Sequence, residues 1–180
     1  TLESRGLGDV YKRQGYDESL GPITNLIGLA QGLSFLGIVR LSGKLFNSNE
    51  NPLLAGAVAV AYGTAVVGLM FTLTPTFIAN GFYQGTMSAD MVTDLGFALN
   101  FTQFLIGALW VSQVVRADSG QLPSWGRNVG NAQAYGSAAV LLAFYFGAIG
   151  ESLFVPALVL FGIVLYPLFI FGLFKAFAEQ

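Results

Sequence analysis

The sequence contains no cysteine and no histidine, and charged residues are scarce. These absences rule out disulfides, thiol chemistry, the usual zinc sites, bis-histidine haem ligation and histidine-dependent hydrolytic triads. Only 10% of the residues are charged, against roughly 25% in a soluble domain. No basic patch of the kind that binds nucleic acid occurs. We therefore expect no cofactor, no nucleic-acid partner and no enzymatic activity. A metal site made only of carboxylates stays open, but it would need acidic residues to converge from separate loops.

Long apolar stretches make up most of the chain, which is 54% hydrophobic. A helix needs about 20 apolar residues to cross a bilayer core of about 30 Å. Five stretches approach or exceed this length, at residues 22–39, 53–74, 94–115, 132–149 and 153–174. They predict an all-α fold, a polytopic transmembrane helix bundle of five spans, within a single integral membrane domain over residues 15–180.

From residue 15 onward, the basic residues divide the connecting loops into two sets. Arg40 and Lys44 follow the first stretch, Arg116 and Arg127 follow the third, and Lys175 follows the fifth. The loops after the second and fourth stretches contain no Lys or Arg. Because cytoplasmic loops retain Lys and Arg during insertion, this alternation predicts a multi-pass protein of the bacterial cytoplasmic membrane. Its C-terminus is expected inside and the N-terminal end of the domain outside.

The first fourteen residues, TLESRGLGDVYKRQ, resemble translated sequencing-adapter read-through, a string that recurs at the ends of unrelated translated sequences. They would also put Arg5, Lys12 and Arg13 on a tail that the other loops assign to the outside. We therefore exclude residues 1–14 from the domain as a non-native tail. If this tail replaced genuine coding sequence, one further upstream helix would give a six-helix parent, of which this chain is a fragment.

Polar residues inside the stretches collect in the half that is predicted to face outward, with Gln31 near the middle. A polar group in hydrocarbon is costly unless it is paired. These side chains therefore either form hydrogen bonds between helices or line a ligand pocket. The pocket set is Asn25, Gln31, Asn100, Gln103 and Tyr145.

Small residues recur at helix-contact spacing in the first two stretches. Gly28 and Gly32 are four residues apart, as are Ala55, Ala59 and Gly63 in turn. A second row in the same stretch contains Ala57, Ala61 and Ala65. Since lipid offers no hydrophobic drive for helices to associate, close backbone contact through small residues supplies packing energy. Both sets predict helix–helix interfaces.

Two functions are compatible with this composition. The first is a non-enzymatic membrane protein that binds or passes a small or lipid-like molecule through the outer-half pocket. The alternative is a structural or partner-binding subunit that docks onto another membrane protein, or onto copies of itself, through the small-residue faces. An intramembrane enzyme would need Asp90, Asp94 and Glu151 to converge around a substrate, and their spacing does not argue for that.

Three local signals carry further expectations. Asn51-Pro52 is a good cap and first-turn pair for the second span. Trp110, shortly before Arg116, is expected at the cytoplasmic interface as part of an aromatic belt. Pro167 lies within the last span, where it predicts a kink or a hinge.

The linker between the third and fourth stretches carries Leu122, Pro123 and Trp125 and is expected to lie along the lipid headgroups. Its segment Ser119-Gly120-Gln121-Leu122-Pro123-Ser124-Trp125-Gly126 resembles the linkers of uncharacterised bacterial polytopic membrane proteins, which generally have six helices and an unknown function. The ending Gly172-Leu173-Phe174-Lys175 is similar as well. The resemblance implies a multi-pass bundle with a lipid bilayer as its surroundings, and it supplies no catalytic or ligand-binding residues.

Overall fold

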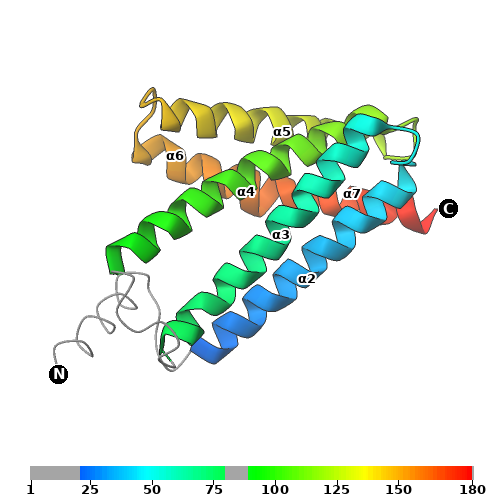
Figure 1. Ribbon diagram of the computed structural model, residues 1–180. Coiled ribbons are helices and arrows are strands. Elements are labelled where there is room, and N and C mark those ends of the chain that lie inside the picture. The colour runs from blue at the N-terminus through cyan, green and yellow to red at the C-terminus, as the bar shows by residue number, and fades with distance from the viewer. Residues whose placement is uncertain (1–20, 80–88, 180) are drawn as a thin grey trace, which may run out of the picture. The chain divides into compact units, whose positions relative to one another are not determined.

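The computed structural model describes residues 21–79 and 89–179, and it is helical throughout them apart from short connections (Figure 1). The predicted all-α class is therefore confirmed for these residues, which contain no strand. The tail at residues 1–14 lies outside the described part. The helices are α2 (Gly21–Leu45), α3 (Pro52–Ala79), α4 (Ala89–Ala117), α5 (Ser124–Tyr145), α6 (Glu151–Leu158), the π-helix η1 (Val159–Leu165) and α7 (Tyr166–Ala178).

The helices do not have the predicted boundaries. The first helix continues to Leu45 rather than 39, and the fourth begins at Ser124 rather than 132 and ends at Tyr145 rather than 149. An apolar stretch marks only the part of a helix that suits hydrocarbon, whereas the backbone hydrogen bonds continue into polar residues at either end. The linker therefore contributes its second half to α5.

One helical run among the described residues, Ser152–Ala178, is long and apolar enough to cross a membrane by length and composition. Only 12% of its most apolar stretch is buried. A helix that is apolar all round needs either protein or lipid around it, so its low burial favours lipid. Pro52–Val67 is a shorter apolar helix. The other predicted spans remain predictions.

The chain divides into two compact units, which we describe separately. The first contains Thr1–Leu36 and Ala65–Asn100. Within it, Gly32 on α2 lies against Leu69 on α3, because a Cβ added at Gly32 would overlap the end of the Leu69 side chain. The second unit contains Gly37–Thr64 and Phe101–Gln180, and it holds the helical hairpin and the linker discussed below.

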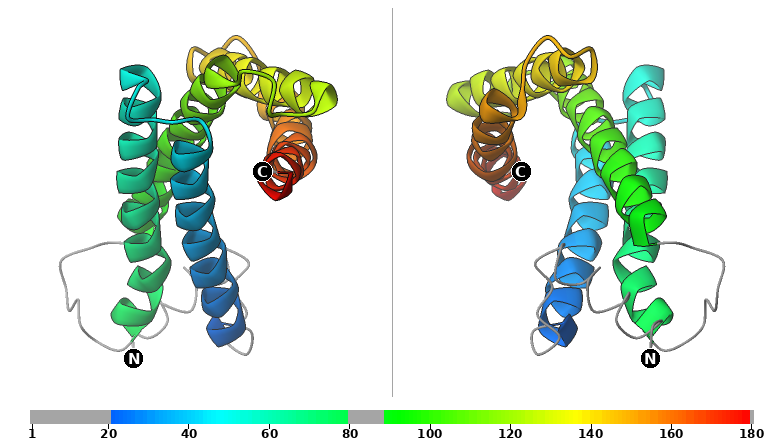
Figure 2. Two further views of the ribbon diagram at one scale, coloured as in Figure 1. Left: turned by 90° about the vertical axis from the view of Figure 1, so that its right-hand side faces the viewer. Right: turned by 90° about the vertical axis from the view of Figure 1, so that its left-hand side faces the viewer.

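In the second unit, α5 packs against the run from α6 to α7, which returns beside it (Figure 2). Gly126 on α5 lies against Gly172 on α7, where a Cβ on Gly172 would lie 3.3 Å from the Gly126 Cα. One turn further along α5, Gly130 faces Phe169 of α7 and Val115 of α4. Gly126 and Gly172 thus let the backbones of α5 and α7 touch, and Gly130 makes room for the side chains of Val115 and Phe169.

Trp110 lies at the centre of this unit, fully buried. Its Nε1 donates to the Ser42 Oγ at 3.0 Å, and its ring meets the edge of Phe169 at a centroid distance of 6.1 Å. Its expected place in an aromatic belt is therefore wrong. The depth of Trp110 along α4 would suit such a belt, but its direction around the helix axis turns it towards α2 and α7.

The last helical run departs from α-helical geometry between its two prolines. Pro156 lies in α6, Pro167 is the second residue of α7, and the π-helical turns of Val159–Leu165 separate them. Pro167 has no N–H to donate to the preceding turn, and its ring would crowd the carbonyl there. Wider π turns at this place relieve that conflict.

Candidate functional site

The predicted ligand pocket is only partly within the described side chains. The side chains of Asn25, Gln31 and Asn100 lie outside them. Gln103 on α4 is half-buried, and its Nε2 donates to the Thr64 carbonyl oxygen of α3 at 3.4 Å. This hydrogen bond between helices is close to the upper limit of length.

Tyr145, the other described member of the pocket set, is the last residue of α5 and is 70% exposed. Its ring stands edge-on to Phe146 at 5.2 Å. A side chain this exposed does not line an enclosed cavity within its unit. The ligand pocket therefore stays a prediction.

A buried polar residue that the sequence argument missed lies on α5. Gln133 is 3% exposed, and its Oε1 accepts no hydrogen bond from the described residues. A buried acceptor without a donor costs about 1–3 kcal/mol. Gln133 lies at the start of the fourth apolar stretch, where the sequence alone does not distinguish a polar boundary from a packed face.

The small residues of α3 occupy two opposite faces. Ala57 and Ala61 are buried, at 4% and 0% exposure. On the other face, Ala59 and Gly63 are exposed and Ala55 is half-buried. Gly56, which was not among the predicted packing residues, is exposed on the same face. A Cβ placed on Gly56 or Gly63 would meet nothing within 4 Å. The backbone of Gly28, the remaining predicted packing residue, belongs to α2, but its surroundings lie outside the description.

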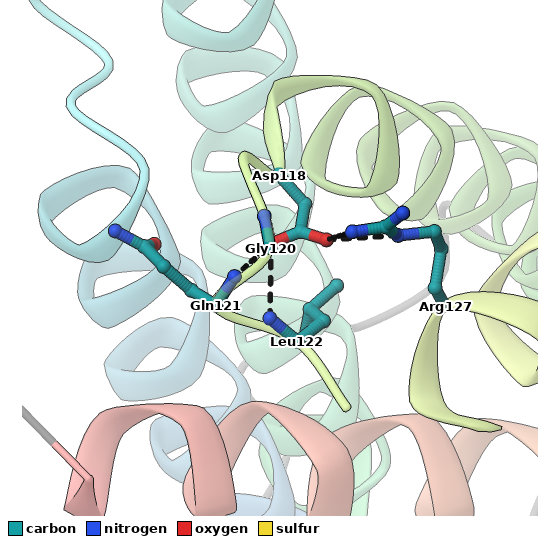
Figure 3. Close-up of polar contacts among 5 residues, drawn as sticks. All are labelled: Asp118, Gly120, Gln121, Leu122 and Arg127. Carbon is teal, nitrogen blue, oxygen red and sulfur yellow. Dashed lines mark hydrogen bonds and ion pairs between the residues drawn. The ribbon is translucent and has the colours of Figure 1, made fainter. Parts of the chain in front are cut away.

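The most highly organised polar group in the second unit is the corner between α4 and α5, built around Asp118 (Figure 3). The Asp118 Oδ1 accepts hydrogen bonds from the backbone N–H groups of Gly120 at 3.1 Å, Gln121 at 2.8 Å and Leu122 at 2.9 Å. Its Oδ2 accepts from the Arg127 guanidinium, with Nε at 2.9 Å. The Asp118 side chain is fully buried by these partners, while that of Arg127 is 43% exposed.

The sequence explains why this corner forms. Asp118 follows directly after α4, where an aspartate accepts hydrogen bonds from the next backbone N–H groups and reverses the chain. Gly120 takes a φ of 109°, a conformation that side chains disfavour. Arg127 lies in the first turns of α5 and therefore faces back towards the corner.

The electrostatics of the corner follow from these contacts. Burial of the Asp118 carboxyl tends to raise its pKa, but the hydrogen bonds from the backbone and from Arg127 outweigh that effect. The net result is a pKa below the ordinary value for aspartate. Asp118 is therefore ionised near neutral pH and serves as a structural anchor.

Part of the linker packs onto its own unit, while its expected position along the lipid headgroups stays a prediction. Leu122 is only 3% exposed, and the Trp125 ring stacks on Phe171 of α7 at 6.0 Å. The reason is the Asp118 corner, which folds the linker back onto its own unit. Among the described residues, no three acidic side chains gather into a group that would hold a metal ion.

We compared the chain with known protein families, curated proteins and solved structures. It matches no protein family, no curated protein and no solved structure. The proposed function therefore rests on the sequence and the structure of this chain alone.

Proposed function

We propose that this chain is a multi-pass protein of the bacterial cytoplasmic membrane, in which α2, α3, α4 and α5 cross the bilayer beside the C-terminal helical run. These four helices contain 25, 28, 29 and 22 residues, which is long enough for a bilayer core that takes about 20 apolar residues. Among the described residues, the C-terminal run Ser152–Ala178 alone has both the length and the apolar composition of a span. Lys44, Arg116 and Lys175 stand in the last turns of α2, α4 and α7, whereas α3 and α5 end without a basic residue. This alternation supports an inner C-terminus.

The function that the geometry supports best is non-enzymatic: a structural or partner-binding subunit. The observation that carries it is the exposed face of α3 formed by Gly56, Ala59 and Gly63, which we call the α3 small face. The opposite face of α3 already packs within its unit through Ala57 and Ala61. A smooth, open face of small residues lets the backbone of another helix approach closely. The occupant we expect is a transmembrane helix of another membrane protein or of a second copy.

Replacing Gly63 with isoleucine should separate that partner without unfolding the chain. The new side chain enters open space in the isolated chain, but it would hold a docked helix away. Because the chain has no cysteine, the Ala59→Cys substitution introduces a single thiol through which the chain can be cross-linked. In native membranes, Ala59→Cys should form a cross-linked product, and adding Gly63→Ile should reduce its yield at least about tenfold, equivalent to about 1.4 kcal/mol of association.

The matched control is Gly107→Ile on α4, where an added Cβ likewise meets nothing within 4 Å. It should leave the cross-linked yield unchanged. A product of twice the chain mass identifies a second copy, and another mass identifies a different subunit. Absence of any product, or equal losses from both glycine substitutions, would count against the α3 small face.

The second candidate is binding or passage of a small or lipid-like molecule. Two observations favour it: the long hydrogen bond of Gln103, which a ligand could displace, and the unpartnered Oε1 of buried Gln133. Both groups lack a strong partner among the described residues. A ligand that supplied one would gain the hydrogen-bonding energy that the protein leaves unused.

Substituting Asn100 and Gln103 together with leucine tests this candidate. A bacterial polar lipid extract should raise the melting temperature of the purified chain in detergent, and the double variant should lose that rise. Differential scanning fluorimetry measures both. If the variant keeps the same rise, or if the wild-type chain shows none, the pocket has no ligand in the extract and the candidate is wrong for lipid-like molecules.

A further inference from the structure

An open groove of about 410 Å³ lies where α2 ends and α3 begins. We call it the basic groove. The polar side chains that line it are Arg40, Lys44, Asn47, Ser48, Asn49 and Tyr62. The size is within the range of small-molecule sites, and no acidic residue lines the groove.

Its two basic residues come from one face of α2. Arg40 and Lys44 are exposed and four residues apart, so they lie about one helical turn from each other on the same face. Neither forms an ion pair with any of the described residues. Glu50, the nearest acidic residue in the sequence, is exposed and is not part of the lining. Two cationic groups therefore face one groove without a carboxylate to neutralise them.

The loop that supplies the neutral donors is held in one conformation. Asn47 adopts a φ of 49°, in the left-handed region that asparagine tolerates better than most residues. The Ser48 N–H donates to the Gly43 carbonyl at 2.8 Å, and the Asn47 N–H donates to the Lys44 carbonyl at 3.3 Å. This pair of bonds is a Schellman motif. It ties up carbonyls at the end of α2 that would otherwise repel an anion.

The following helix start completes the groove. The Asn51 Oδ1 accepts from the Leu54 N–H at 3.2 Å, which confirms the expected cap of α3. Gly43 is buried, and a Cβ there would lie 3.3 Å from the Ser48 Oγ and 3.5 Å from a Val58 methyl group. The lack of a side chain at Gly43 thus lets the loop close tightly over α3. As a result, the polar groups are presented by a fixed backbone.

We infer that the basic groove binds a phosphate group, carried either by the headgroup of an anionic lipid or by a soluble phosphate compound. Arg40 supplies a planar fork of N–H donors and Lys44 a compact positive charge, and these are the groups that proteins use for phosphate oxygens. The side chains of Asn47, Ser48, Asn49 and Tyr62 add neutral donors around the same space. The groove shares no residue with the α3 small face or with the predicted ligand pocket.

The test uses the full chain in detergent, with two probes. Native mass spectrometry measures retention of phosphatidylglycerol against phosphatidylcholine, and calorimetry measures binding of inorganic phosphate. Each basic residue near an anionic headgroup contributes roughly 1 kcal/mol, so Arg40→Gln with Lys44→Gln should weaken binding about 30-fold. Both side chains are exposed, so the melting temperature should not change.

The matched control is Arg116→Gln, which removes a basic charge at an exposed position that does not line the groove. It should weaken binding by less than about twofold. Selective retention of phosphatidylglycerol assigns the groove to a lipid headgroup, and binding of inorganic phosphate alone assigns it to a soluble compound. The inference is overturned if neither probe binds, if the double variant binds as well as the wild type, or if Arg116→Gln causes an equal loss.

Discussion

Replacing Gly130 with valine should destabilise the second unit by about 3 kcal/mol, at the upper end of the usual effect of overpacking. A Cβ alone at this position would lie 2.7 Å from a Val115 methyl group and 2.8 Å from two carbons of the Phe169 ring. Valine adds two more carbons in the same place. Because Gly130 lies where α4, α5 and α7 meet, no single helix can move away without opening another contact.

The measurement is unfolding by SDS in mixed micelles, followed by tryptophan fluorescence, to which buried Trp110 and the more exposed Trp125 both contribute. Gly37→Val is the control, because a Cβ at Gly37 on α2 meets nothing within 4 Å, and its effect should be within about 0.5 kcal/mol. Shrinking the neighbour with Phe169→Leu should recover part of the stability of Gly130→Val. If the two substitutions simply add, the crowding at Phe169 is not the cause.

Replacing Asp118 with alanine should cost about 3 kcal/mol. Three backbone N–H groups at the corner would lose their acceptor, and Arg127 would lose its partner. Removing one member of a fully buried ion pair costs about 3–5 kcal/mol, but Arg127 is 43% exposed and can be hydrated, so the lower end applies. SDS unfolding provides the measurement.

Arg127→Gln separates the stabilisation that comes from Asp118 Oδ1 from that of Oδ2. It removes the guanidinium and leaves the three backbone bonds to Oδ1 intact, so its cost should be clearly smaller than that of Asp118→Ala. An equal or larger cost would show that the ion pair, and not the backbone bonds, holds the corner.

The pH dependence of unfolding stability provides an independent measure of how much Asp118 stabilises the corner. The folded pKa of Asp118 is lower than its ordinary value, so its stabilising effect is complete above the ordinary range and is lost as the pH falls through the depressed pKa. The difference in stability between wild type and Asp118→Asn should accordingly be constant near neutral pH and shrink under acid conditions.

The sequence predicted the helical class and the capped start of α3, because both depend on local patterns of composition and spacing. It also pointed to Pro167, beside which the π turns occur. It did not reveal the central place of Trp110 or the meeting of helices at Gly130, since both depend on the direction of a residue around its helix and on partners far along the chain. The best clue to the corner was the order Asp118, Gly120 and Arg127, which is a turn signal followed by a cation.

The corner at Asp118 also has a consequence for the order of folding. All its bonds join residues at most nine positions apart, so little chain entropy is lost when they form. The contact of Gly130 with Phe169 requires nearly the whole hairpin to have been synthesised. We therefore expect the corner to form during translation, as soon as Arg127 has left the ribosome. It would then align α5 to serve as the template on which the apolar C-terminal helix assembles.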